Sequence, residues 1–315
     1  MGTLADTKIK SPLFARKQAG GVFTVVNETL TTGNIFYVDS GQTTTGGTTT
    51  SFGRSPDAPF LTLASALAAC TAANGDMIFL MPGHAEAPVA TITVSVAGVS
   101  IIGMGNGVNR PVFTHAHTAA DDNIDVTAAD VRIENIKLAA GTNGAGDTVQ
   151  VNVGAAAHNF TMKNCYIEMG EKNLQCFTVA ATANRGSLLD LTIQGTAANP
   201  DSIVVFEGGS DGWLIDGMDA TFTAATDIDG PVFYQNAVAM EDLIIRNVRV
   251  MPVKADGLVI DFNSASTGIV DNLLTYTLAA TIGDLYDWGN LMIGTVRAGG
   301  AATIAYQYPI VTLAP

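Results

Sequence analysis

Seven short stretches of this chain repeat one pattern, in which alternating hydrophobic residues lead to an Asn, Asp or Gly and then resume. Hydrophobic residues that alternate with a period of two around a residue tolerant of left-handed backbone indicate strand, corner and strand. A nearly constant spacing of roughly 20 to 50 residues is typical of a solenoid. Successive spacings are 32, 29, 26, 27, 30 and 25 residues between the central residues Gly103, Asn135, Asn164, Asp190, Gly217, Asn247 and Asn272. The repeat therefore predicts a parallel β-helix.

Further alternating runs lie between these stretches, for example 149–153 and 258–262. One period is then one coil of about three short strands, stacked on the next coil at ~4.8 Å. We expect an all-β solenoid of about seven or more coils, in which inward side chains of consecutive coils form columns. One predicted column contains Ile133, Met162, Leu188, Ile215, Ile245 and Val270.

Four of the central residues are asparagines, and they are expected at equivalent corners of successive coils, where their amides can hydrogen-bond along the stack. These residues are Asn135, Asn164, Asn247 and Asn272. A catalytic role for them is the alternative, but the corner geometry favours a structural ladder.

The strongest helical pattern precedes the coils. Thr62 is a suitable N-cap for an Ala/Leu-rich run that ends near Cys70, and we expect a helix near 60–73. A solenoid exposes hydrophobic residues at its ends, so a helix at this position is expected to cap the first coil. Residues 35–280 are predicted to form the β-helix together with this cap.

The segment from Phe60 through the Ala/Leu-rich run to Gly75-Asp76, the strand 77–81 and Pro82-Gly83 resembles the N-terminal part of the pectate-lyase-like superfamily. This resemblance implies a right-handed parallel β-helix over roughly residues 35–280. The strand 35–40 and the Gly/Thr-rich loop 41–50 are similar to the start of β-helical proteins of tailed-bacteriophage virions. The second resemblance implies a virion structural protein assembled in the cytoplasm of a bacterial host.

Enzymes of that superfamily carry recognisable catalytic sets. Pectate lyases combine a calcium-binding Asp cluster with a basic residue that abstracts a proton, and polygalacturonase-like hydrolases combine three aspartates with Gly-His-Gly and Arg-x-Lys. Neither set is visible in this sequence. Asp190, Asp216, Glu241 and Asp242 could lie on a coil face, but their spacing selects no carboxylate pair for glycoside hydrolysis. We therefore assign no catalytic residue, and the sequence favours a non-enzymatic protein while leaving an enzyme open.

One cluster has ligand types suited to a metal. Asp121, Asp122 and Asp125, with Asp130 nearby, provide carboxylates for Ca²⁺, and two imidazoles earlier in the chain are suited to a softer metal. These imidazoles belong to His115 and His117, which a strand would place on one face. A solvated acidic turn is the alternative that we favour, so no metal or other cofactor is assigned.

Aromatic residues on a β-helix flank can stack against sugars. Trp213, Phe222, Tyr166 and Tyr234 lie in or beside expected strands, where the alternating pattern makes most of them core or subunit-contact residues.

Charge is unevenly distributed. The chain has a formal net charge of −14, yet residues 1–34 hold Lys8, Lys10, Arg16 and Lys17 against two acidic residues, so this arm is +2 and the remainder is −16. A basic arm on an acidic rod is typical of an anchor that binds an acidic surface. An ordinary unstructured tail is the alternative. Nucleic-acid binding is not expected, because no basic stripe with aromatic residues is present.

Other features concern the compartment and the assembly. The N-terminus lacks a signal-peptide pattern and no apolar run could span a membrane. Cys70, Cys165 and Cys176 are an odd number of cysteines, which we interpret as buried thiols. Residues 281–315 form an apolar β region that a single rod would expose, and association into a homotrimer would cover it.

These features favour a non-enzymatic virion protein that decorates a capsid through its N-terminal arm, with the major capsid protein or another virion protein as partner. The alternative is a tailspike-type receptor-binding protein or depolymerase that acts on a host surface glycan. A secreted polysaccharide lyase is a third hypothesis, which the missing signal peptide and catalytic set disfavour.

Overall fold

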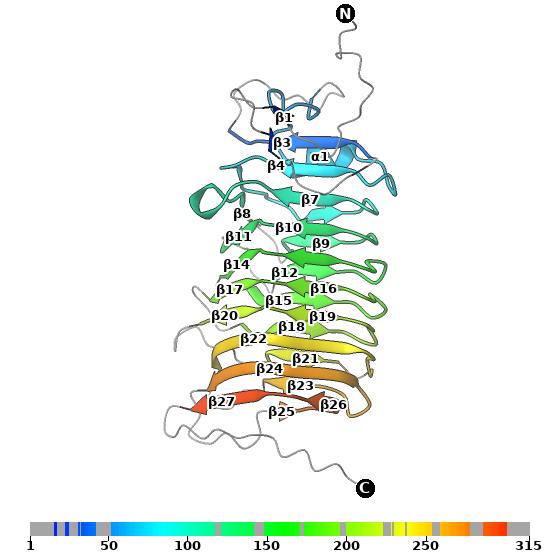
Figure 1. Cartoon of the computed structure of the whole chain (residues 1–315), viewed down its shortest axis with the longest axis vertical. Helices are drawn as coiled ribbons and strands as arrows, with labels where there is room; N and C mark the ends of the chain where they lie inside the picture. Colours follow the sequence, from blue (N-terminus) through cyan, green and yellow to red (C-terminus); the bar gives the residue numbers. More distant parts are fainter. Residues whose placement is uncertain are drawn as a thin grey trace, which may run out of the picture.

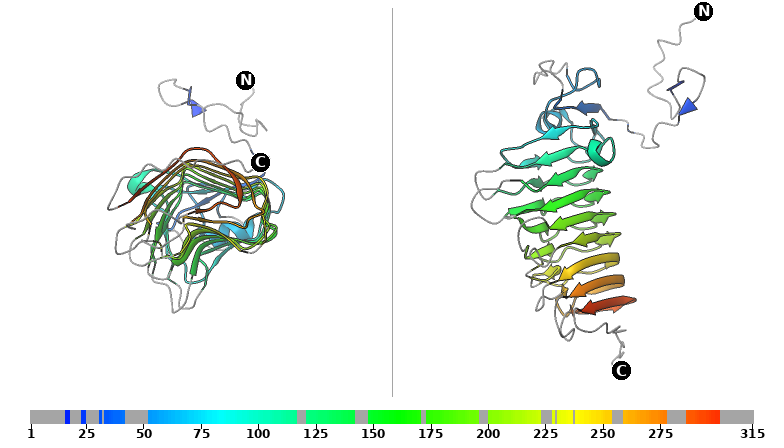
Figure 2. Two further views of the ribbon diagram at one scale, coloured as in Figure 1. Left: turned by 90° about the horizontal axis from the view of Figure 1, so that it is seen from below. Right: turned by 90° about the vertical axis from the view of Figure 1, so that its left-hand side faces the viewer.

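The computed structural model describes residues 16–17, 23–24, 31, 33–41, 52–116, 121–141, 148–170, 173–195, 200–222, 228, 230–236, 238–253, 259–277 and 286–300. These residues form a right-handed parallel β-helix of about seven turns with a single α-helix in the described part (Figure 1). Seen along its axis, the coils overlie one another around a common core (Figure 2). The predicted fold class is confirmed.

Each coil contributes strands to three faces of the rod. The first face consists of β4 (Met77–Leu80), β7 (Ser100–Gly103), β10 (Arg132–Glu134), β13 (Thr161–Lys163), β16 (Ser187–Leu189), β19 (Leu214–Asp216), the first halves of β22 (Leu243–Val253) and β24 (Thr267–Thr277), and β26 (Asn290–Ile293). The second face consists of β5 (Ala85–Glu86), β8 (Val112–Thr114), β11 (Lys137–Ala139), β14 (Tyr166–Met169), β17 (Thr192–Gly195), β20 (Asp219–Thr221), the second halves of β22 and β24, and β27 (Val296–Gly300).

The third face closes each coil. It consists of β6 (Ile92–Val94), β9 (Ile124–Val126), β12 (Thr148–Val153), β15 (Asn173–Val179), β18 (Ser202–Phe206), β21 (Phe233–Gln235), β23 (Ile260–Asp261) and β25 (Tyr286–Asp287). Within each face the neighbouring strands are parallel and pair with the equivalent strand of the next coil. Residues 286–300 continue all three faces as a last coil.

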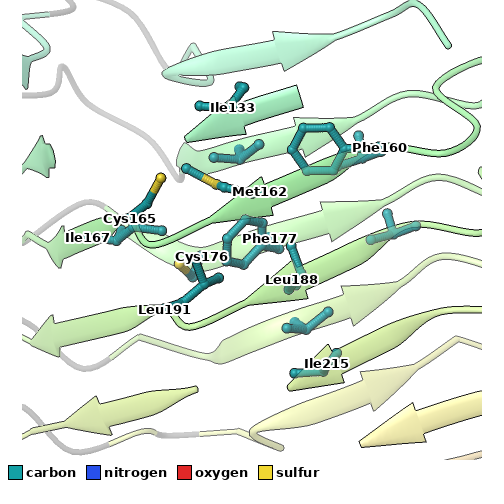
Figure 3. Packing of buried hydrophobic residues seen from close by; sticks show 14 of the residues in the cluster. Ile133, Phe160, Met162, Cys165, Ile167, Cys176, Phe177, Leu188, Leu191 and Ile215 are labelled. Atoms are coloured by element: carbon teal, nitrogen blue, oxygen red, sulfur yellow. The ribbon is translucent and has the colours of Figure 1, made fainter. Parts of the chain in front are cut away.

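The core consists of inward columns, as predicted. Ile133, Met162, Leu188, Ile215, Ile245 and Val270 are in register on consecutive coils and are buried. Figure 3 shows the first four of them. The column continues toward the N-terminus through Ile101, Ile78 and Phe36. Burial of each such side chain contributes about 1.5–3 kcal/mol, so the columns supply most of the stability of the rod.

One oversized side chain fits the core because a neighbouring coil has none at that point. Trp213 is fully buried, and its indole Nε1 donates to the Ala183 carbonyl at 2.6 Å. A Cβ on Gly186, which precedes the equivalent strand of the previous coil, would lie 2.3 Å from the Trp213 ring. The tryptophan is therefore a core residue.

The N-terminal end is covered by α1 (Leu63–Ala69) and β3 (Ile35–Val38), which pairs with β4. The predicted N-cap is confirmed, because the Thr62 side chain accepts from the Ser65 amide at 3.2 Å. A second acceptor, Glu86 Oε2, binds the Leu63 amide at 2.9 Å. Leu63, Ala66 and Leu67 face inward and are buried, which covers the first coil.

The three thiols differ in burial. Cys165 and Cys176 are fully buried in the core (Figure 3), as predicted, but Cys70 at the end of α1 is only half-buried. Burial raises the pKa of Cys165 to about 12 and that of Cys176 well above its usual value. Burial and the nearby Asp76 carboxylate raise the pKa of Cys70 to about 12 as well. These thiols are poor nucleophiles.

Asp76 fixes the turn that leads from α1 into β4. Its buried carboxylate accepts hydrogen bonds from the Asn34 amide, the Thr71 amide and Asn74 Nδ2, each at 2.6 Å. Burial acts to raise the pKa of Asp76, but these hydrogen bonds outweigh it and hold the pKa below its usual value. The carboxylate thus stabilises the native state above the ordinary Asp pKa of about 3.9, and this stabilisation is lost as the pH falls.

We expect Asp76→Asn to lower the thermal unfolding midpoint at pH 7, because a buried group that accepted three hydrogen bonds is replaced, at a cost of about 1–3 kcal/mol. The difference from the wild type should begin to shrink as the pH falls to about 4, where the unfolded chain takes up a proton at Asp76, and should shrink further as the pH passes through the lowered native pKa. Circular dichroism melts measure both effects, with the exposed Asp57→Asn as control. A difference that stays constant with pH would contradict this role.

Candidate functional site

The corner between the first and second faces contains the predicted ladder. Six of the seven predicted central residues have positive φ, namely Asn135, Asn164, Asp190, Gly217, Asn247 and Asn272, with φ between 51° and 73°. The seventh, Gly103, is the last residue of β7 and does not have the left-handed conformation. The backbone amides of Asn135, Asn164, Asp190 and Gly217 donate to the next coil, for example from Asn164 to the Leu189 carbonyl at 3.0 Å. The side-chain amides donate in the opposite direction, to the preceding coil. Asn164 Nδ2 donates to Asn135 Oδ1 at 3.2 Å, and Asn272 Nδ2 donates to Asn247 Oδ1 at 2.8 Å. The structural interpretation of these asparagines is confirmed.

A second corner column, between the third and first faces, was not predicted. It consists of Gly98, Asp130, Asn159, Arg185, Gly212 and Asp242, with φ between 58° and 73°. Here too the backbone amide donates to the next coil, as from Arg185 to the Asp211 carbonyl at 2.7 Å. The signal in the sequence was weak, because Arg185 breaks the Asn, Asp and Gly pattern.

Polar side chains on the outside of the first two faces pair across coils. Lys137 Nζ lies 2.7 Å from Glu168 Oε1, and Arg249 Nε and Nη2 bind both oxygens of Asp219 at 2.8 and 2.6 Å. Arg246 Nε lies 2.8 Å from Asp216 Oδ2. Exposed pairs of this kind each contribute little to stability.

These contacts settle the roles of three carboxylates that the sequence left open. The hydrogen bond from Asn247 Nδ2 at 2.8 Å, followed by the Arg246 guanidinium, lowers the pKa of Asp216 against the effect of burial. Asp190 and Asp242 are corner residues with φ of 52° and 58°. Asp216 is thus ionised, and its negative charge is balanced by Arg246. It therefore does not resemble a general acid, which must hold a proton.

A carboxylate pair does occur on the third face. Asp261 and Asp287 are outward residues of β23 and β25 and are directly in register, with Tyr234 on the preceding coil. Burial, and then the nearby Asp287 carboxylate, raise the pKa of Asp261. Adjacent strands lie ~4.8 Å apart, which is close to the separation of paired carboxylates in retaining glycosidases, ~5–5.5 Å.

This pair is not among the residues predicted from the sequence. Each aspartate stands between two apolar residues, Ile260 and Phe262 in one coil and Tyr286 and Trp288 in the next. This pattern would have indicated outward carboxylates at equivalent positions if the last coil had been recognised.

The proposed metal ligands have different surroundings in the structure. Asp125 is an outward residue of β9 and binds Asn152 Nδ2 at 3.2 Å, whereas His115 is fully buried and Asp121 is exposed. Burial and the adjacent Asp122 carboxylate raise the pKa of Asp125. Among the described residues, no three His, Cys, Asp or Glu side chains come together as a metal site. His117 lies outside the described residues.

Asp130, which the sequence analysis grouped with these carboxylates, belongs to the second corner column. Its Oδ1 accepts from Asn159 Nδ2 at 2.7 Å, so it serves the stacking of the coils.

The arm is described only in part. Arg16 and Lys17 form β1 (Arg16–Lys17), which pairs antiparallel with β2 (Phe23–Thr24). Lys8 and Lys10 lie outside the described residues. Particle attachment through these four side chains stays a prediction.

The aromatic residues considered for sugar stacking divide into two groups. Trp213 and Phe222 are buried, which excludes them from a binding surface. Tyr166 and Tyr234 are half-buried on outward positions, and Lys137 Nζ lies 5.2 Å from the centre of the Tyr166 ring.

A pocket of about 500 Å³ lies between α1 and the segment 86–95. Its lining includes Thr62, Leu67, Glu86, Val89 and Thr91. Glu86 is the one charged residue among the described residues that line it, and Oε2 of Glu86 binds the Leu63 amide and lies 3.3 Å from His84 Nε2. This carboxylate therefore serves the capping helix.

In the part of the chain that the structure describes, no helix has the length and apolar character needed to cross a bilayer.

We expect substitutions at Asn247 to separate the two functions of a corner residue. Asn247→Gly keeps the left-handed backbone and loses only the amide bonds, at about 1 kcal/mol. Asn247→Ala should cost roughly 1–2 kcal/mol more, because a Cβ disfavours this conformation. Thermal unfolding of both variants tests this order, and equal midpoints would contradict it.

Comparison with known proteins gives the fold and no closer relationship. No protein-family model matches the sequence, and no curated protein matches it. Among solved structures, two of a pectin methylesterase, each in complex with a hexasaccharide, align with TM-score 0.50 and 13% identity over 88% of this chain and 92% of theirs. A rhamnogalacturonan lyase aligns with TM-score 0.41 and 15% identity over 84% of this chain and 74% of its own. These neighbours are parallel β-helix proteins of the pectate-lyase-like fold.

Proposed function

We propose that this chain is a non-enzymatic structural protein of a bacteriophage virion, a β-helical rod that decorates the capsid and is attached through residues 1–34. The observation that carries the proposal is the pairing of polar side chains on the first and second faces with one another across coils, as in Lys137–Glu168 and Arg249–Asp219. Such a surface stiffens a rod and leaves few free groups for catalysis.

Charge supports attachment through the arm. The arm is +2 and the rest of the chain is −16, so the rod is repelled by an acidic particle surface while the arm is attracted to it. The partner would be the major capsid protein or another virion protein. The resemblance of residues 35–50 to the start of virion β-helical proteins points to the same location.

Binding to purified capsids tests the proposal. Replacement of Lys8, Lys10, Arg16 and Lys17 by Gln should weaken co-sedimentation at least tenfold, and wild-type binding should weaken with rising salt. A control with Lys163, Arg185, Arg249 and Arg297 replaced by Gln has the same net charge and should bind like the wild type. Equal loss in both variants, or none in either, would exclude the arm as the anchor.

Cryo-electron microscopy of the particle then locates the rod. Density on the capsid that disappears when residues 1–34 are deleted supports decoration. Density confined to the tail tip would move the protein to receptor binding.

A glycan-cleaving tailspike is the second candidate, and the Asp261–Asp287 pair is the observation that favours it. The similar pectin methylesterase structures hold a hexasaccharide, which shows that this fold can present a saccharide-binding surface in that protein. In this chain Asp261, with its raised pKa, would protonate the leaving oxygen, and Asp287 would act as nucleophile.

Depolymerisation of host surface glycan is the corresponding measurement. If this candidate holds, Asp261→Asn and Asp287→Asn each lower the rate by a factor of about 10³ or more, whereas Asp219→Asn on the second face leaves it unchanged. Wild-type activity should also decline as the pH rises and Asp261 loses its proton. The absence of cleavage by the wild-type chain would remove this candidate.

A further inference from the structure

The corner between the first and second faces is expanded in one coil. From β10 onward, either two residues separate the two strands at this corner or one strand runs through it. Between the end of β7 at Gly103 and the start of β8 at Val112, the same connection is the longer segment 104–111. We call residues 104–110 the corner loop, which projects from the rod between β7 and β8 (Figure 1). Insertions in a solenoid form surface loops of this kind.

The base of the corner loop is fixed, whereas its tip is exposed. Asn135 Nδ2 donates to the Gly103 and Gly105 carbonyls at 2.8 and 2.9 Å. The tip is a short 3₁₀ helix, η2 (Gly107–Asn109), whose Val108 side chain is 96% exposed. Asn106 precedes η2 and is exposed, and its side chain makes no capping hydrogen bond. The amide of Asn106 is therefore accessible to solvent.

Asn106 is followed by a glycine, a pair whose chemistry differs from that of other asparagines. The chain has three Asn-Gly dipeptides, at Asn74, Asn106 and Asn143, and the last lies outside the described residues. In such a dipeptide the backbone nitrogen of the glycine can attack Cγ of the asparagine, because no Cβ shields that nitrogen. The surroundings of Gly107 are open, since a Cβ built on it would have no heavy atom within 4 Å.

The reaction proceeds in two balanced steps. The Gly107 nitrogen loses its proton and forms a bond to Cγ of Asn106, the Cγ–Nδ2 bond breaks, and ammonia leaves with the proton. Water then opens the resulting five-membered succinimide at one of its two carbonyls. Opening at one carbonyl gives Asp, and opening at the other gives isoaspartate, in which the backbone runs through the side chain. One amide and one water are thus converted into one carboxylic acid and one ammonia.

The same dipeptide at Asn74 is held by its neighbours. Asn74 is half-buried, its Nδ2 donates to Asp76 Oδ1 at 2.6 Å, and its backbone amide donates to the Thr71 carbonyl at 3.3 Å. The Asn74 carbonyl lies against Gly33, because a Cβ on Gly33 would be 2.6 Å from that oxygen. Ring closure requires rotation of the backbone at Asn74, which breaks these contacts. This dipeptide can therefore react only after local unfolding.

We propose that Asn106 is a site of spontaneous deamidation, at which the folded chain converts itself to Asp and isoaspartate. The reaction needs only water, so it is independent of the proposed function. Each event lowers the formal net charge by one, from −14 to −15. Because the conversion is irreversible, the fraction of modified chains rises with the age of the protein.

The modification changes the corner loop and leaves the rod intact. The Asn106 carbonyl accepts from the Asn109 amide at 3.1 Å. In isoaspartate this carbonyl becomes a free carboxylate outside the backbone, so the geometry of η2 changes. The hydrogen bonds from Asn135 at the base of the loop do not involve residue 106 and remain.

Peptide mapping of aged protein tests the proposal. Cleavage before aspartate yields the fragment 57–75, which contains Asn74, and the fragment 76–120, which contains Asn106. A new cleavage before residue 106 reports Asp, whereas an uncleaved fragment that has gained a carboxylic acid reports isoaspartate. In the folded chain Asn106 should convert at least tenfold faster than Asn74. The rate should rise with pH, because the attacking nitrogen must lose its proton.

Two controls separate the effect of the fold from that of the dipeptide. In urea, where the contacts of Asn74 are lost, the two asparagines should convert at rates within a factor of three. Asn106→Gln should abolish conversion at this position, because its longer side chain must close a six-membered ring, and should leave the thermal unfolding midpoint unchanged.

Three results would overturn the proposal. The first is an unmodified Asn106 after prolonged incubation of the folded chain at alkaline pH. The second is equally fast conversion of Asn74 in the folded chain. The third is a difference between the two asparagines that persists in urea, since the local sequence and not the fold would then determine it.

Discussion

The rod depends on two corners per coil at which a residue in the left-handed region turns the chain and donates its amide to the next coil. Each corner thereby fixes a change of direction and the distance to the neighbouring coil at once. Asn164 and Arg185 show both effects, with positive φ and hydrogen bonds of 3.0 and 2.7 Å to the following coil. Because the corners recur at every level, the three faces stay in register and the inward side chains can form unbroken columns.

The same repetition explains how much the sequence could predict. The first corner was recognisable because Asn tolerates left-handed backbone and stands between alternating hydrophobic residues. The inward column through Ile133 and Met162 followed from it. The second corner was missed because hydrogen bonds of the backbone, which any residue can make, hold Arg185 there. Trp213 illustrates another limit, because its place depends on the missing side chain of Gly186 on the previous coil.

Site residues were harder to predict than the fold. Outward positions carry no periodic hydrophobic signal, so the sequence could not tell that Asp216 faces Arg246 or that Asp261 stands beside Asp287. The structure distinguishes these two aspartates by their neighbours. A cation and an amide hold Asp216 ionised, whereas burial and a like charge raise the pKa of Asp261. Chemistry on this fold thus depends on which residue the neighbouring coil places at the same level.

The N-terminal and C-terminal parts of the rod also differ from each other. The N-terminal end is closed by α1, whose buried leucines cover the first coil, and residues 1–34, which carry the opposite charge to the rod, precede it. Toward the C-terminus the outward residues of the first face change from Arg132, Thr161 and Ser187 to Leu214 and Ile244. The stacked corners join these two parts of the rod through one continuous series of hydrogen-bonded coils.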